Sequence, residues 1–173
     1  REAAVAGLFY PADAGELSET VRSLLSSGQP AGSAPRALIV PHAGYVYSGA
    51  VAATAYATLI PFADCYRRVV LLGPSHRVPL SGLASSSADA FRTPLGDVPL
   101  DRRLIAAVDS PFVFVSEEAH RLEHSLVVQL PFLQTVLNEF TLVPLVVGDT
   151  APENVAAVID ALWNEPGTLF VVS

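Results

Sequence analysis

The stretch Val69-Val70-Leu71-Leu72-Gly73-Pro74-Ser75-His76 decides the fold class, because four aliphatic residues lead directly into a Gly-Pro turn and a histidine. A second stretch, Ala37-Leu38-Ile39-Val40-Pro41-His42, repeats this arrangement. Further aliphatic runs occur at 142–147 and 169–172. Short runs rich in Val, Leu and Ile that alternate with helix-length segments are typical of βαβ units and a parallel sheet. We therefore predict strands near 37–41, 69–73, 142–147 and 168–173.

The segments between these runs have apolar residues at helical spacing, which predicts helices that flank the sheet. Prolines predict two irregularities. Pro131 should kink the fourth helix, and Pro144 indicates a strand that lies near an edge, is bulged or starts after the proline. A turn or hairpin is expected around Thr93–Asp97. The predicted helices are Asp13–Leu25, Ser48–Leu59, Asp101–Val108, Ser125–Leu137 and Pro152–Leu162.

Composition supports a single α/β domain over residues 1–173. Of the 173 residues, 51% are apolar and 16% are charged, which excludes a disordered chain. The mean hydropathy is +0.43, yet no apolar run approaches the roughly 18 residues of a membrane span. High hydropathy without a span indicates strands that are buried on both faces. We therefore expect no membrane association.

Charge and cysteine content bear on partners and location. Ten basic and seventeen acidic residues give a net charge of −7, which disfavours nucleic-acid binding. The single cysteine, Cys65, cannot form an internal disulfide, and no signal peptide is visible, so a cytoplasmic location is expected. The chain starts at Arg1 without a methionine and stops inside a predicted strand. We expect it to be a fragment of a longer protein.

Two histidines follow predicted strands directly. In open α/β sheets, ligands bind beyond the carboxyl ends of the strands, and His42 and His76 both occupy such positions. Imidazole is the commonest metal ligand in proteins, so we predict that both residues bind a metal. A lone histidine after a strand is more often an ordinary hydrogen-bonded loop residue. Two histidines after two strands make the metal interpretation the stronger one.

A third histidine, His124, lies beside Glu123 at the start of a predicted helix. These two residues are candidates for an acid/base pair or for support of the metal ligands; the alternative is that Glu123 is only a favourable charge in the first helical turn. His120 is expected to be structural. The third metal ligand is left open, with Glu123 and Asp149 as the local candidates. We expect Tyr45, Tyr47, Ser75 and Asp149 to line the pocket.

Five blocks occur in a fixed order along the chain: Arg1–Pro11, Pro41–Gly49, Gly73–His76, Thr93–Asp97 and Glu123–Leu133. Together they resemble the Memo family, which in bacteria and archaea is also labelled AmmeMemoRadiSam system protein B. No serine-hydrolase elbow, phosphate-binding loop or dinucleotide fingerprint is present, so those enzyme classes are disfavoured.

The resemblance implies an α/β fold similar to that of the class III extradiol (LigB-type) dioxygenases, which use non-haem iron(II). It also implies a metal site at His42 and His76, with His124 lining the pocket. The family usually continues beyond the last strand and has a later cysteine that completes the metal site. It commonly has a glutamate where this sequence has Val127.

Three functions remain open at this point. The first is a redox enzyme with iron(II), in which His42 and His76 bind the metal and His124 acts as acid or base. The second is a non-catalytic adaptor that captures a peptide or small molecule. The third is a metal hydrolase with a zinc-activated water; copper is a further option. Because two histidines are few ligands, we expect weak metal binding or none, and binding at least about tenfold tighter in a longer chain. The oligomeric state is left open.

Overall fold

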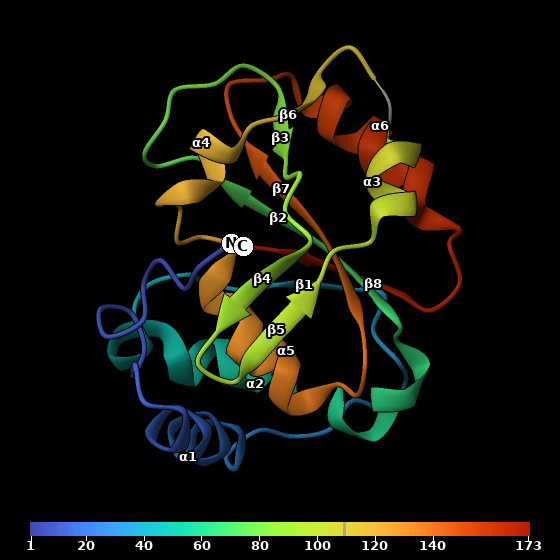
Figure 1. Ribbon diagram of the computed structural model, residues 1–173. Helices are drawn as coiled ribbons and strands as arrows, with labels where there is room; N and C mark the ends of the chain where they lie inside the picture. The colour runs from blue at the N-terminus through green and yellow to red at the C-terminus, as the bar shows by residue number, and fades with distance from the viewer. Residues whose placement is uncertain (109) are drawn as a thin grey trace.

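The computed structural model describes residues 1–108 and 110–173 and has three layers, a six-stranded sheet between two layers of helices (Figure 1). Strands β1, β8, β2 and β7 are parallel, whereas β3 pairs with β7 in the antiparallel direction. This confirms the predicted α/β class with a mostly parallel sheet. In spatial order, the strands are β1 (Ala37–Ile39), β8 (Thr168–Val172), β2 (Arg68–Pro74), β7 (Thr141–Val147), β3 (Leu83–Ser85) and β6 (Val113–Val115).

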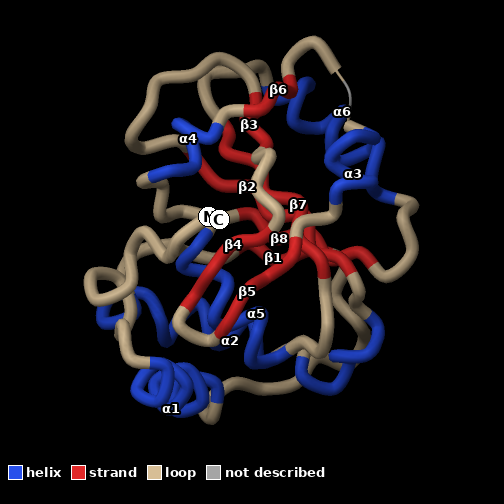
Figure 2. Tube along the Cα trace, in the orientation of Figure 1, coloured by secondary structure: helices blue, strands red, loops and turns tan. Residues whose placement is uncertain are grey.

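Helices lie on both sides of the central strands (Figure 2), and alternate residues of these strands belong to two different hydrophobic cores. Val69 and Leu71 of β2 belong to the core that includes α1 (Ala14–Leu25), α2 (Ala50–Ala57) and α5 (Leu130–Val136). Val70 and Leu72 belong to the core that includes α3 (Arg102–Ala107) and α6 (Pro152–Trp163). Helices on both faces leave no solvated face on these strands, which explains why the runs are continuously aliphatic.

The predicted turn around Thr93–Asp97 is a two-stranded hairpin, formed by β4 (Ala90–Thr93) and β5 (Gly96–Pro99). A short helix, α4 (Glu117–Arg121), was not predicted, since its five residues are too few for a periodic pattern. Three further short helical segments are a π-helix at Tyr45–Gly49 and 3₁₀-helices at Ile60–Cys65 and Val127–Gln129.

The predicted helices at 13–25, 101–108 and 152–162 match α1, α3 and α6 to within one or two residues at each end. The predicted kink at Pro131 is wrong. The α-helix begins at Leu130, so the proline occupies its first turn, where a missing N–H breaks no helical hydrogen bond.

Pro144 lies within β7, which has a neighbour on each side. The carbonyl of Leu142 accepts a hydrogen bond from the N–H of Asp101, so the backbone N–H and C=O groups of the even-numbered residues of β7 point away from β2. On that side β3 pairs only with Val146 and Val147. At Pro144, this side of β7 is therefore a local open edge, where no neighbouring strand needs an N–H donor. This is why the strand tolerates the proline.

Within the described residues, no helix is long and apolar enough to cross a membrane. The longest helices, α1 and α6, have 12 residues each. Cys65 is a free, exposed cysteine.

The carboxyl end of β2 packs directly against the segment that carries His124. A Cβ atom added at Gly73 would lie 2.7 Å from Ser125 Oγ and 2.8 Å from Leu126 Cδ2. Contacts this short require the absence of a side chain. Gly73 therefore lets two sequence-distant segments approach at the sheet edge.

We expect Gly73→Ala to destabilise the fold by about 1–3 kcal/mol, because the new methyl group overpacks this junction. Urea unfolding monitored by circular dichroism measures the change. Gly32→Ala is the matched control, since a Cβ at Gly32 meets nothing within 4 Å. Equal stability of the two variants would contradict the tight junction.

Candidate metal centre

His42, His76 and His124 lie together at the carboxyl edge of the sheet. Each offers a ring nitrogen, and these three atoms all lie within 4.8 Å of one another. The ring centroids are 5.2 Å apart for His42 and His76, 5.7 Å for His42 and His124, and 4.4 Å for His76 and His124. One metal ion with bonds of about 2.0–2.1 Å to imidazole nitrogens can bridge such a group.

Parallel pairing explains why two of the histidines meet. His42 follows β1 and His76 follows β2, and both strands pair with β8 in the same direction. Their carboxyl ends therefore lie at the same edge of the sheet. His124 arrives from the segment after α4, which is fixed to this edge by a hydrogen bond of 2.9 Å from Ser125 Oγ to the carbonyl of Pro74.

A buried carboxylate contacts the His76 ring and binds the backbone of two of the three histidines. The Glu123 side chain is 1% exposed. It accepts backbone hydrogen bonds from His76 (2.6 Å), His124 (2.8 Å) and Ser125 (2.9 Å), and it lies 2.9 Å from His76 Nδ1. Burial opposes ionisation, but these hydrogen bonds and the His76 ring lower the pKa of Glu123 to about 2.

Glu123 is therefore ionised near neutral pH and can only accept hydrogen bonds. It follows that His76 Nδ1 carries a proton. In the neutral ring, the lone pair that a metal would use is then on Nε2. Metal-binding histidines commonly have such a carboxylate partner, which fixes the tautomer and the ring orientation. Glu123 thus orients the His76 ring and does not belong to the histidine cluster itself.

The other two rings are suited to the neutral form that binds metal. Burial, together with the nearby His76, lowers the pKa of His42. Burial also lowers the pKa of His124, against the attraction of Glu123. The His124 ring lies between Phe9, at 4.5 Å, and His76, at 4.4 Å. Its Nδ1 is buried and lacks a hydrogen-bond partner, although Glu123 Oε1 is 3.3 Å away in an unfavourable direction.

The donor set fits a transition metal. Catalytic sites commonly use three protein ligands and leave a position open, and imidazole suits zinc, copper, iron and nickel. The sequence leaves the third ligand open, with Glu123 and Asp149 as the local candidates. Among the described residues the cluster contains histidines only, and Asp149 is an exposed residue outside it.

The residues expected to line the pocket are dispersed. Tyr45 belongs to the core, where its hydroxyl donates to the carbonyl of Val128 at 2.8 Å, so it is not free to bind a ligand. Tyr47 is 86% exposed. Ser75 and Asp149 line a neighbouring hollow of about 570 Å³, and Ser75 Oγ donates to the carbonyl of Val78.

Two polar residues at the site were missed by sequence reasoning. Ser173 Oγ lies 3.2 Å from His42 Nδ1, and it accepts a hydrogen bond of 2.7 Å from Gln129 Nε2. Gln129 is the one polar residue within the apolar run Leu126–Leu133, and this pattern could have marked it as a buried polar group with a partner.

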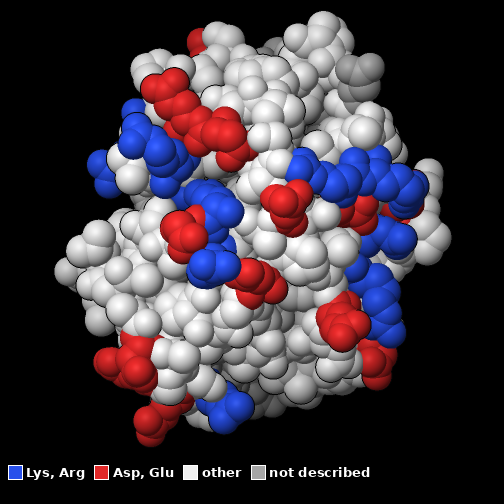
Figure 3. Space-filling view, viewed as in Figure 1, with Lys and Arg blue, Asp and Glu red and all other residues white. Residues whose placement is uncertain are grey.

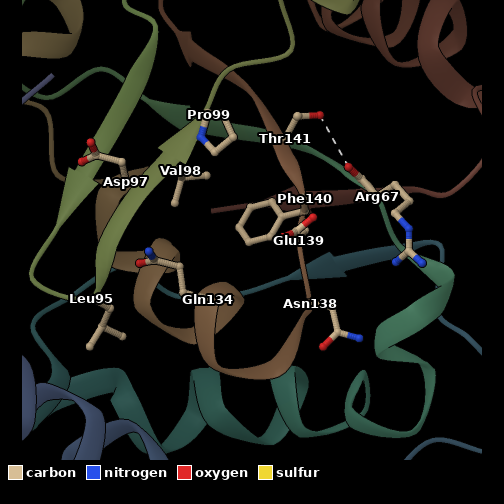
Figure 4. Close-up of a pocket in the computed structure, with 10 residues that line it drawn as sticks. All are labelled: Arg67, Leu95, Asp97, Val98, Pro99, Gln134, Asn138, Glu139, Phe140 and Thr141. Atoms are coloured by element: carbon tan, nitrogen blue, oxygen red, sulfur yellow. Dashed lines mark hydrogen bonds between the residues drawn. The ribbon is translucent and has the colours of Figure 1, made fainter.

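A larger hollow, of about 850 Å³, lies at the opposite edge of the sheet, where β2 and β7 begin (Figure 4). Arg67, Thr141 and Asn138 are among its lining residues, and it contains no histidine. On the face in Figure 3, basic side chains have acidic side chains beside them. Ion pairs of the structure include Arg103–Glu165 and Arg92–Asp97.

The chain matches a known protein family along its whole length. The family model described as "Memo-like protein" matches residues 1–173. The chain belongs to the Memo-like family. This confirms the resemblance inferred from the five sequence blocks.

Curated relatives in the Memo-like family span vertebrates and bacteria. "Protein MEMO1" of Danio rerio and that of Homo sapiens are each 36% identical over 182 residues, covering 100% of this chain and 61% of the relative. The "MEMO1 family protein" of Aquifex aeolicus is 43% identical over 149 residues, covering 85% of this chain and 54% of the relative. The present chain thus spans about 61% of the length of its vertebrate relatives.

We expect Glu123→Gln to destabilise the fold by about 1–3 kcal/mol, because an amide NH₂ would face N–H donors in a buried position. The His76 ring would also lose the anion that fixes its proton. Chemical unfolding measures the first effect. Glu118→Gln, at an exposed position of α4, is the matched control and should be neutral. A neutral Glu123→Gln would show that the carboxylate charge is dispensable.

His120 is predicted to make the fold acid-sensitive. It is buried, and its Nε2 lies 3.0 Å from the carbonyl of Ala84. Burial and the Arg1 charge lower its pKa to about 4. An unfolded imidazole titrates near 6.5, so the unfolded state binds protons more strongly between about pH 6.5 and 4, and stability falls as the pH falls through this window.

Between pH 7 and 4.5, the free energy of unfolding should therefore fall by about 2–3 kcal/mol less in His120→Gln than in the wild type. Urea unfolding at both pH values measures the difference. Arg121→Gln, a non-titrating neighbour on α4, should behave like the wild type. An unchanged acid sensitivity of His120→Gln would assign the effect to other groups.

Proposed function

We propose that this chain carries the metal centre of a Memo-like protein, with His42, His76 and His124 as the ligands of one divalent ion. The observation that supports this most strongly is the approach of three ring nitrogens within 4.8 Å. A second support is the contact of Glu123 with His76 Nδ1, because this carboxylate orients a histidine and leaves the binding of the ion to the three rings.

In this proposal His124 is a ligand instead of an acid or base. Only with His124 does the described chain reach the three protein ligands of a catalytic site. Glu123, with a pKa of about 2, holds no proton to donate near neutral pH, so its role is to orient His76 and the backbone around it. The side chain of His76 is 38% exposed, which leaves the site open to solvent and to a substrate.

We further propose a non-haem iron(II) redox function, similar to that of the extradiol dioxygenases. Iron(II) supplies redox chemistry and open positions for O₂ and an organic substrate. The residues contribute orientation and charge. Three neutral imidazoles leave the ion its full positive charge, and Phe9 shields one side of His124 from water. The substrate is proposed to be a small molecule.

A second candidate is a metal hydrolase. An all-histidine ligand group with an open position is also found in catalytic zinc sites, which activate a bound water. A third candidate is an adaptor that binds a peptide. It is favoured by Val46 and Tyr47, which are 89% and 86% exposed beside the His42 loop.

We expect the present chain to bind one equivalent of zinc or iron(II) under anaerobic conditions. Replacing any one of the three histidines by glutamine should weaken binding at least about tenfold, or 1.4 kcal/mol. Isothermal titration measures the affinity, and His120→Gln is the control that should bind like the wild type. If all three variants bind the metal as tightly as the wild type, the metal centre lies elsewhere.

Reaction with oxygen separates the candidates. The iron(II)-loaded protein should consume O₂ in the presence of a catechol or a reductant, whereas the zinc-loaded protein should not. An oxygen electrode measures the uptake. Ester hydrolysis by the zinc form without O₂ uptake by the iron form would favour the hydrolase. Binding of peptides without metal would favour the adaptor.

A further inference from the structure

A buried polar chain runs from the core to the His42 ring. Tyr56 and Gln129 are 0% and 1% exposed. Tyr56 Oη donates to Gln129 Oε1 at 2.9 Å. Gln129 Nε2 donates to the carbonyl of Pro41 at 3.0 Å and to Ser173 Oγ at 2.7 Å. Ser173 Oγ in turn donates to the carbonyl of Ser125 at 2.6 Å.

The direction of each hydrogen bond in this chain follows from the available protons. The carbonyl of Pro41 can only accept, so the amide NH₂ of Gln129 must face it, and this fixes the amide orientation of Gln129. Gln129 Oε1 then accepts the single proton of the Tyr56 hydroxyl. The two N–H groups of Gln129 are both used, on Pro41 and Ser173. The single proton of Ser173 points to the carbonyl of Ser125, which can only accept.

Ser173 Oγ therefore has no proton left for His42. Its remaining contact, 3.2 Å to His42 Nδ1, is a hydrogen bond only if the ring nitrogen is the donor. In the other tautomer, two lone pairs would face each other, unless Ser173 turned its proton away from Ser125 and left that carbonyl unpaired.

We propose that Gln129 and Ser173 are positioning residues that hold His42 in the tautomer protonated at Nδ1, with its Nε2 lone pair free for a metal ion. The consequence for metal binding rests on the proposed function, whereas the tautomer does not. Ser173 thus acts on His42 as Glu123 acts on His76, with a neutral oxygen in place of a charged one.

The same polar chain also sets the spacing of the three histidine loops. Gln129 fixes the carbonyl of Pro41, one residue before His42. Ser173 fixes the carbonyl of Ser125, one residue after His124. Ser125 Oγ then donates to the carbonyl of Pro74, two residues before His76. Every loop that carries a ligand is therefore attached to this chain of hydrogen bonds.

The tautomer is tested on metal-free protein with isotopically labelled histidine, at a pH well above the ordinary imidazole value of about 6.5. Proton–nitrogen correlation spectra distinguish a protonated Nδ1 from a protonated Nε2, and loss of a signal in His42→Gln assigns the ring. The wild type should show Nδ1 protonated. Ser173→Ala should shift the ring toward Nε2 protonation, and Ser173→Thr, which retains the hydroxyl, should restore the wild-type spectrum.

Two further variants make this test decisive. Ser75→Ala removes a hydroxyl at the same sheet edge that is outside the polar chain, and it should leave the His42 spectrum unchanged. Gln129→Met removes the donor to Ser173 at similar volume, and it should also raise the fraction protonated at Nε2. If Ser173→Ala does not fold, Gln129→Met carries the test. Protonated Nε2 in the wild type, or an unchanged spectrum in both Ser173→Ala and Gln129→Met, overturns the proposal.

Metal titration provides the second readout. Ser173→Ala should weaken cobalt(II) or zinc binding by about 10–100-fold, and Ser173→Thr should restore it. If the wild type shows the predicted tautomer but binds no metal, the proposed function fails and the inference about His42 stands. If the wild type binds metal and Ser173→Ala shows both the wild-type tautomer and the wild-type affinity, the inference fails and the proposed function stands.

Discussion

The helical layers, the aliphatic strands and the histidine cluster all follow from the parallel pairing of β1, β8 and β2. It places the carboxyl ends of three strands side by side, and it forces the connections between strands to cross the faces of the sheet as helices. Those helices bury both faces, so the strands are aliphatic throughout and polar side chains are confined to the ends. His42, His76 and His124 lie at one edge because the buried faces of the sheet have no place for them.

The site then has to satisfy many polar groups in little space. It does so with two acceptors of different kind, the carboxylate of Glu123 and the hydroxyl of Ser173. Glu123 lies beside the His76 ring and Ser173 beside the His42 ring. Each of the two also forms a hydrogen bond with the backbone of Ser125. Ring orientation and loop position are therefore set by the same hydrogen bonds, so the fold itself holds the ring nitrogens in place.

The sequence predicted the central strands, three helices and the approach of His42 and His76, because aliphatic runs and the residues that follow them are local patterns. It predicted less about His124, whose place depends on the close packing of Gly73 against Ser125. The role of Glu123 was left open, since a carboxylate beside a histidine looks alike in sequence whether it faces a metal or three backbone N–H groups. Gln129 and Ser173 were missed because their partners are distant along the chain.

The position of β8 has a consequence for how the protein is made. β1 and β2 carry two of the clustered histidines but do not pair with each other; β8 lies between them, although it is synthesised more than one hundred residues after β1. A ribosome must therefore release β8 before these two strands can be held in register. Closing such a distant pairing is slow compared with forming local helices. A nascent chain that stops before β8 thus exposes two unpaired strand edges, and it is at this stage that we expect the protein to depend most on chaperones.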